Sequence, residues 1–144
     1  GLERRPDCCL INYYGEGARM GLHQDRDEAD FAWPVVSVSL GDPGLFRVGN
    51  QTRGGKTESV WLDSGDVVVL GGPARLVYHG VDRIKFGAGT LLPKGGRINL
   101  TLRSDGQAIG TVRHAVGTGP GIYRGDHLAA GAIAQNRDAV GRVG

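Results

Sequence analysis

Residues 97–103 alternate strictly between polar and apolar side chains. Ile98, Leu100 and Leu102 share one face, and the polar residues between them share the other, because successive strand residues point to opposite sides of a sheet. Residues 35–40 repeat the pattern, with Val36, Val38 and Leu40 on one face. An amphipathic helix would need a period of 3.6 residues, so both stretches predict strands with one apolar face.

Other short apolar runs are separated by turn-forming residues. The sequence predicts further strands at residues 8–14, 20–24, 45–48, 58–62, 66–70 and 76–79, with a connection of lower regularity over residues 81–93. Run 66–70 is nearly all β-branched, which predicts a central strand buried on both faces. The chain contains 26 glycines, and stretches such as 41–44 (Gly-Asp-Pro-Gly) are strong turn signals. With no convincing helix before residue 104, this pattern indicates an all-β sandwich or jelly roll.

The alternation ends after residue 103. Residues 104–144 contain nine glycines and many alanines, and such a segment buries too little apolar surface to offset its ordering entropy. We therefore expect a core over residues 1–103 and a poorly ordered, flexible extension over residues 104–144. Residues 129–140 form at most a weak helix, and we expect His114 and His127 to be solvated and not to act as ligands.

Length and composition limit the class of protein. A chain of 144 residues with a net charge of +2 fits one domain, and this charge permits nucleic-acid binding without arguing for it. Cys8 and Cys9 are adjacent, which is unfavourable for a structural disulfide and fits a reducing, cytoplasmic setting. No apolar run is long enough to span a membrane, and no signal peptide opens the chain.

A His-x-Asp pair, His23 and Asp25, lies at the end of the predicted second strand. Residues two apart in a strand project from the same face, so an imidazole nitrogen and a carboxylate oxygen can converge on one ion. His79 supplies a second imidazole far along the chain. Two histidines and one carboxylate form the facial triad of non-haem Fe(II) oxygenases. The three-residue motif alone is a weak signal because it also occurs by chance.

The polar face of residues 97–103 strengthens the metal hypothesis. It carries Arg97, Asn99 and Arg103, and buried guanidiniums require an anionic partner. Arginine binds carboxylates in a bidentate manner, so an inward-facing strand would suit a dicarboxylate next to the metal. The alternative is that this face is solvated and that both arginines are ordinary surface charges.

Together these stretches resemble the AlkB family of Fe(II)/2-oxoglutarate-dependent dioxygenases. The matching segments are 12–14 (NYY), 21–28 (GLHQDRDE), 35–41 (VVSVSLG), 65–69 (GDVVV), 78–80 (YHG) and 97–103 (RINLTLR). They occur in the family's order and cover about residues 8–103. The resemblance implies a double-stranded β-helix, or jelly-roll, core.

The same resemblance implies a set of site residues. Fe(II) would be held by His23, Asp25 and His79. The positions where the family binds 2-oxoglutarate are Asn12, Tyr13, Tyr14, Arg97, Asn99, Thr101 and Arg103. Asp27 and Arg53 match positions that contact the damaged base and the nucleic acid, although each could equally be a solvated loop charge.

The implied reaction is oxidative removal of N-alkyl groups from DNA or RNA bases by O2, with release of formaldehyde, succinate and CO2. The substrate would be single-stranded or presented by base flipping, and the enzyme would be a monomer. The family places a nucleotide-recognition lid before this core, and we expect the chain to lack most of it. The alternative function is a truncated, non-catalytic β-core that acts as a binding or vestigial module.

Overall fold

The computed structural model describes residues 5–28, 30–104, 111–117 and 123–125. These residues form one short 3-10 helix, η1 (Gly72–Ala74), and the following strands: β1 (Cys8–Tyr14), β2 (Met20–His23), β3 (Val35–Gly41), β4 (Gly44–Val48), β5 (Glu58–Leu62), β6 (Val67–Leu70), β7 (His79–Ile84), β8 (Arg97–Arg103), β9 (Thr111–Gly117) and β10 (Tyr123–Gly125). In this part of the chain, no helix has the length and apolar character needed to cross a lipid bilayer.

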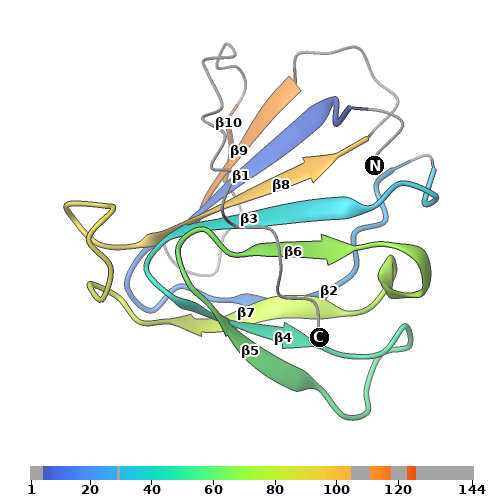
Figure 1. Ribbon diagram of the computed structural model, residues 1–144, viewed down its shortest axis with the longest axis horizontal. Coiled ribbons are helices and arrows are strands. Elements are labelled where there is room, and N and C mark those ends of the chain that lie inside the picture. The colour runs from blue at the N-terminus through green and yellow to red at the C-terminus, as the bar shows by residue number, and fades with distance from the viewer. Residues whose placement is uncertain (1–4, 29, 105–110, 118–122, 126–144) are drawn as a thin grey trace.

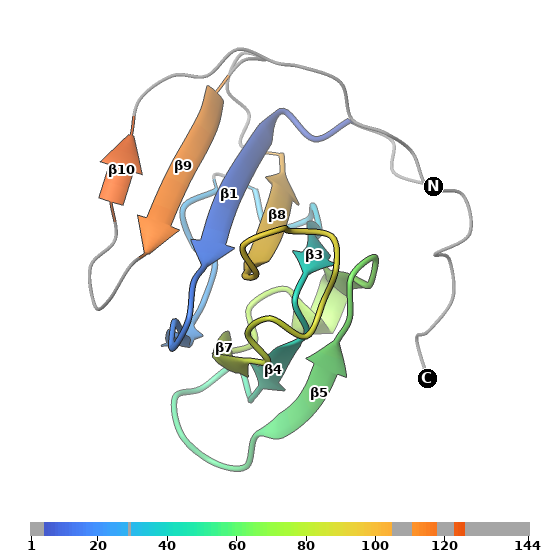
Figure 2. The same cartoon turned by 90° about the vertical axis from the view of Figure 1, so that its left-hand side faces the viewer.

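The strands form two sheets that face each other (Figures 1 and 2). The first sheet has the order β10-β9-β1-β8-β3-β6, and the second has the order β2-β7-β4-β5. Neighbouring strands are antiparallel except for β1 and β9, which are parallel. Strands distant in sequence thus lie side by side, and the predicted all-β jelly roll is confirmed.

The inner face of the first sheet can be identified from its packing. Tyr14 on β1 packs with Phe46, Leu62 and Val81 of the second sheet in a buried cluster. The register pairs Tyr14 with Arg97, so the polar residues of β8 lie on the inner face of the first sheet. The structure therefore settles the orientation that the sequence left open.

Two strand predictions were wrong. Strand β6 is not central, because it forms the end of its sheet among the described residues, and Val67 and Val69 are 40% and 54% exposed. Its β-branched composition therefore reflects strand propensity and not burial on two faces. The strand predicted at 76–79 instead begins at His79 and continues to Ile84, because pairing with β2 and β4 extends it through the expected connection.

Two strands also lie within residues 104–144, where no strand was expected. β9 pairs with β1 over seven positions, and β10 pairs with β9. This pairing depends on a long-range neighbour and does not appear in the local pattern. The possible helix at 129–140 and His127 lie outside the described residues, and the division of the chain at residue 103 stays a prediction.

Candidate metal centre

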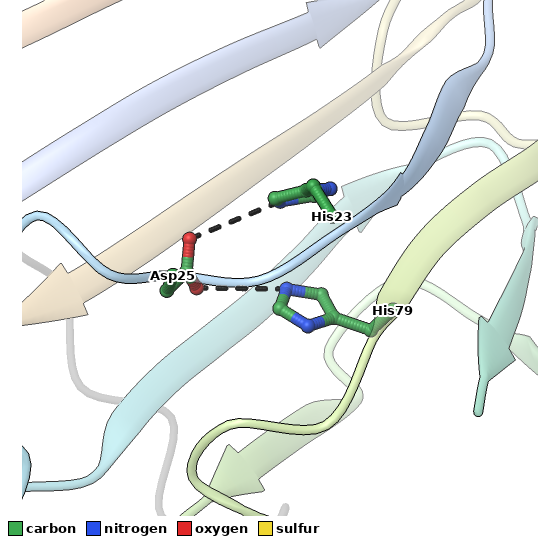
Figure 3. Close-up of side chains that lie close together, drawn as sticks. All are labelled: His23, Asp25 and His79. Carbon is green, nitrogen blue, oxygen red and sulfur yellow. Dashed lines mark ion pairs between the residues drawn. The ribbon is translucent and has the colours of Figure 1, made fainter. Parts of the chain in front are cut away.

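The three predicted ligands converge between the two sheets. His23 ends β2 and His79 begins β7, and the register of these strands places the two residues directly opposite each other. Asp25 follows two residues after His23. Figure 3 shows the three side chains pointing toward one another.

A glycine permits this close approach of β2 and β7. A Cβ atom at Gly80 would lie 2.5 Å from the carbonyl oxygen of Met20 and 2.8 Å from that of Gly21. Both obstacles are backbone atoms, so no side-chain rotation could relieve the contact. The absence of a side chain at Gly80 therefore sets the spacing of the strands that carry the two histidines.

The separations between the ligand atoms suit one ion. Nε2 of His79 lies 3.5 Å from Oδ2 of Asp25, and Nε2 of His23 lies 3.8 Å from Oδ1 of Asp25. One ligand atom from each residue lies within 4.8 Å of the others. Two ligands held about 2 Å from one ion lie at most about 4 Å apart, so small adjustments bring all three into coordination.

Both imidazoles are oriented by backbone carbonyls. Nδ1 of His23 lies 3.0 Å from the carbonyl oxygen of Gly21, and Nδ1 of His79 lies 3.0 Å from that of Val77. A carbonyl oxygen only accepts hydrogen bonds, so each Nδ1 carries the proton and each Nε2 presents a lone pair. Metal-binding histidines are commonly fixed in this way.

The electrostatics keep His23 and Asp25 in their metal-binding protonation states. Burial lowers the pKa of His23, and the neighbouring His79 lowers it further, which favours the neutral imidazole. Burial raises the pKa of Asp25, but the neighbouring His79 and the charge of Arg103 outweigh this and bring it to about 2. Asp25 is therefore an anion at neutral pH.

The inner face of β8 presents an unsatisfied cation. Arg97 is only 1% exposed, and its Nη2 donates to Oγ of Ser39 at 2.8 Å. Among the described residues its Nε and Nη1 have no hydrogen-bond partner, and an uncompensated buried guanidinium is strongly unfavourable. A carboxylate would satisfy both nitrogens, so the arrangement fits the distal carboxylate of 2-oxoglutarate.

The residues around Arg97 leave room for its guanidinium. Its side chain lies against Gly44, where a Cβ atom would come within 2.7 Å of Nε. The guanidinium lies 5.4 Å from the centre of the Tyr14 ring. Burial raises the pKa of Tyr14 to about 12, so its hydroxyl remains a hydrogen-bond donor.

The other predicted 2-oxoglutarate residues divide between the two faces of the sheet. Asn12, Tyr14, Asn99 and Thr101 are buried on the face that carries Arg97. Nδ2 of Asn99 donates to Oγ1 of Thr101 at 2.8 Å, and its Oδ1 accepts from Ser37 at 2.7 Å. These contacts fix the orientation of the Asn99 amide.

Tyr13 lies apart from this group. Its hydroxyl donates to the carbonyl oxygen of Gly95 at 3.2 Å, and its ring occupies the space that a Cβ atom at Gly96 would need. The structure therefore places Tyr13 against the loop before β8, because neighbouring strand residues point in opposite directions.

The two predicted substrate residues are exposed. Asp27 follows the triad in the loop after β2, and Arg53 lies in the loop between β4 and β5. The amide nitrogen of Gln24 donates to the carbonyl oxygens of Gln51, at 3.0 Å, and Leu76. Gln24, which lies between His23 and Asp25, therefore connects the candidate metal centre to the loop that carries Arg53.

The sequence analysis did not single out two buried charges near the triad. Glu28 and Arg75 form an ion pair with 2.8 Å between Oε2 and Nη2, and both side chains are almost fully buried. Glu28 lay within a matched segment, and its position shortly after Asp25 could have identified it. No sequence signal separates Arg75 from the other arginines.

A His-Asp-His cluster between two sheets, together with a buried and unsatisfied arginine on the inner face of one of them, defines the class of non-haem Fe(II) oxygenases that use an anionic cosubstrate. Comparison with known proteins agrees. The model of the 2OG-Fe(II) oxygenase superfamily matches residues 2–103. The chain belongs to this superfamily and, within it, to the AlkB family. Fe(II), 2-oxoglutarate and O2 are therefore its cofactor and cosubstrates.

Relatives share this part of the chain. The alpha-ketoglutarate-dependent dioxygenase AlkB homolog of Caulobacter vibrioides is 62% identical over 101 residues, which cover 70% of this chain and 46% of the relative. AlkB of Escherichia coli is 48% identical over 103 residues, which cover 72% and 47%. The solved structure of OsALKBH1 matches with a TM-score of 0.60 and 42% identity, covering 66% of this chain and 48% of that one. The chain thus spans about half the length of these relatives.

Proposed function

We propose that this chain holds the iron and cosubstrate site of an enzyme that oxidatively removes N-alkyl groups from nucleic-acid bases. The observation that carries the proposal is that the triad and the buried, unsatisfied Arg97 both lie between the two sheets. His23, Asp25 and His79 would hold Fe(II). When bound, the metal with 2-oxoglutarate and O2 supplies oxidation of a C–H bond, and the cosubstrate leaves as succinate and CO2.

The protein's own residues would position the cosubstrate. Arg97 would bind its distal carboxylate through Nε and Nη1, and Arg103 would lie closer to the end that chelates the metal. Asn12, Tyr14 and Asn99 would line the same face, with Thr101 fixing the Asn99 amide. Tyr13 would support this face indirectly through the loop before β8.

The substrate would be an N-alkylated base. Oxidation of an N-methyl carbon gives an N-hydroxymethyl group, which releases formaldehyde and leaves the unmodified base. A base inside a duplex could not reach the buried triad, so single-stranded or flipped substrate is required. Asp27 and Arg53 would contact the base and the nucleic-acid backbone from their exposed loops.

The names of more distant relatives differ on the kind of nucleic acid. DNA N(6)-methyladenine demethylase ALKBH1C of Arabidopsis thaliana and tRNA demethylase abh1 of Schizosaccharomyces pombe both match this core. Both DNA and RNA are therefore candidate substrates. The monomeric state and the cytoplasmic location stay predictions.

The first test is anaerobic addition of Fe(II) and 2-oxoglutarate to the chain, followed by visible absorbance. We expect a metal-to-ligand charge-transfer band that is absent from His79→Ala and retained in His127→Ala, a matched control in the C-terminal extension. Formaldehyde release from methylated single-stranded DNA and RNA oligonucleotides then tests turnover. No band from the folded chain would refute the proposed site, and a band without formaldehyde would favour the non-catalytic binding module.

A further inference from the structure

Four charged side chains form a row of ion pairs that begins at Asp25 of the triad. We call Asp25, Arg103, Glu28 and Arg75 the buried charge chain. Oδ1 of Asp25 lies 3.1 Å from Nη2 of Arg103, and Nη1 of Arg103 lies 3.0 Å from Oε1 of Glu28. Oε2 of Glu28 lies 2.8 Å from Nη2 of Arg75. Positive and negative groups thus alternate from the candidate metal ligand inward.

Arg75 uses its whole guanidinium to hold the segment between β2 and β3 at three points. Its Nε donates to the carbonyl oxygen of Trp33 at 2.8 Å, and its Nη1 donates to the carbonyl oxygen of Asp25 at 2.9 Å. The remaining Nη2 pairs with Glu28, and the ring of Phe31 lies 5.3 Å from the guanidinium carbon. Only a planar group with donors in several directions can make these contacts, so lysine could not replace Arg75.

This arrangement holds Asp25 at two points. Asp25 lies beyond the end of β2, so the strand itself does not fix it. Arg75 binds its backbone carbonyl and Arg103 binds its carboxylate. Buried ion pairs are weak contributors to stability, and a role in geometry explains better why these charges are buried beside a metal ligand.

Glu28 also limits how Arg103 can bind the carboxylate of Asp25. By binding Nη1 of Arg103, Glu28 keeps Nη1 and Nη2 from binding Asp25 together, and Nη2 alone binds Oδ1. The other oxygen, Oδ2, faces Nε2 of His79 at 3.5 Å and stays free for an ion. Without the charge of Glu28, Nη1 and Nη2 of Arg103 could together bind both oxygens of Asp25 in the bidentate geometry that arginine and carboxylate prefer.

We propose that Glu28 and Arg75 are positioning residues, which keep one oxygen of Asp25 available to the metal and hold its backbone in place. This inference rests on the metal site of the proposed function. Removal of the partners that orient a metal ligand typically weakens metal binding by about 10- to 100-fold. We expect losses of that size for Glu28→Gln and for Arg75→Lys.

The test measures the affinity of the full chain for Mn(II), from the EPR signal of the free ion, in the presence of 2-oxoglutarate. The matched control is Arg83→Lys, the same substitution at a side chain that is 66% exposed on β7. Circular dichroism and thermal melting of the metal-free variants report on folding. We expect weaker Mn(II) binding by Glu28→Gln and Arg75→Lys, and unchanged binding by Arg83→Lys. The double variant should lose less than the two single losses combined, because both act through Asp25.

Two outcomes would overturn the inference. One is Mn(II) affinity within twofold of the unmodified chain in both variants. The other is a lower melting temperature with unchanged affinity of the folded protein, which would make the buried charge chain purely structural. If the unmodified chain itself binds no Mn(II), the metal site of the proposed function fails instead, so the two failures are distinguishable.

Discussion

Substitution of Gly80 by alanine should disrupt the metal site without touching any ligand. The new Cβ atom would lie 2.5 Å from the carbonyl oxygen of Met20, whereas ordinary contacts begin at 3.4 Å. Strands β2 and β7 would therefore have to separate locally by about 1 Å. Metal sites tolerate ligand displacements of only about 0.2 Å, and such overpacking typically destabilises a protein by about 1–3 kcal/mol.

The matched control for this variant is Gly21→Ala. Gly21 lies on β2 beside the same contact, but a Cβ atom there would meet nothing within 4 Å. Mn(II) affinity and thermal melting should be measured for both variants. We expect Gly80→Ala to bind Mn(II) at least about tenfold more weakly and Gly21→Ala to bind it normally. Equal affinities in the two variants would show that the spacing of β2 and β7 does not set the ligand geometry.

Three further predictions concern the ligands and the cosubstrate. Arg97→Lys should bind 2-oxoglutarate about 10- to 100-fold more weakly by calorimetry on the Mn(II)-loaded chain, because lysine keeps the charge but lacks the paired N–H donors of a guanidinium. Unchanged affinity would contradict the assignment of Arg97 to the distal carboxylate. Mn(II) at 100 times its dissociation constant should stabilise the fold by about 2.7 kcal/mol, so EDTA should lower the melting temperature of the loaded protein and leave that of His79→Ala unchanged. In metal-free protein, the low pKa of Asp25 contributes about 2 kcal/mol of stability. This contribution is complete above its ordinary pKa of 3.8 and is lost as the pH falls through about 2. Urea unfolding at several acidic pH values should show this loss relative to Asp25→Asn, and parallel profiles for the two proteins would argue against it.

Much of the β core could be predicted from local sequence. The boundaries of β1, β5 and β8 match the predicted strands, because short apolar runs and alternating residues bounded by turn signals are local marks of strands. Where burial depends on the position in the sheet, local patterns were misleading. The edge position of β6 and the pairing of β9 with β1 are set by neighbours far along the chain.

The candidate ligands could also be identified from sequence, since His-x-Asp places two ligands on one face. The supporting residues could not. Arg75 acts on Asp25 from 50 positions away, and the role of Gly80 arises from the backbone of another strand. Neither contact leaves a periodic or compositional signal near the residue that makes it.

The sequence by itself therefore determined the β-strand character of the core, the choice of the three candidate ligands and the presence of a polar face on β8. The tertiary structure alone decided that this face points inward, that Arg97 is buried without a full set of partners, and that Glu28 separates two arginines behind the triad. The physical reason is that side-chain periodicity is local, whereas burial and charge pairing depend on which distant strands and loops are brought together.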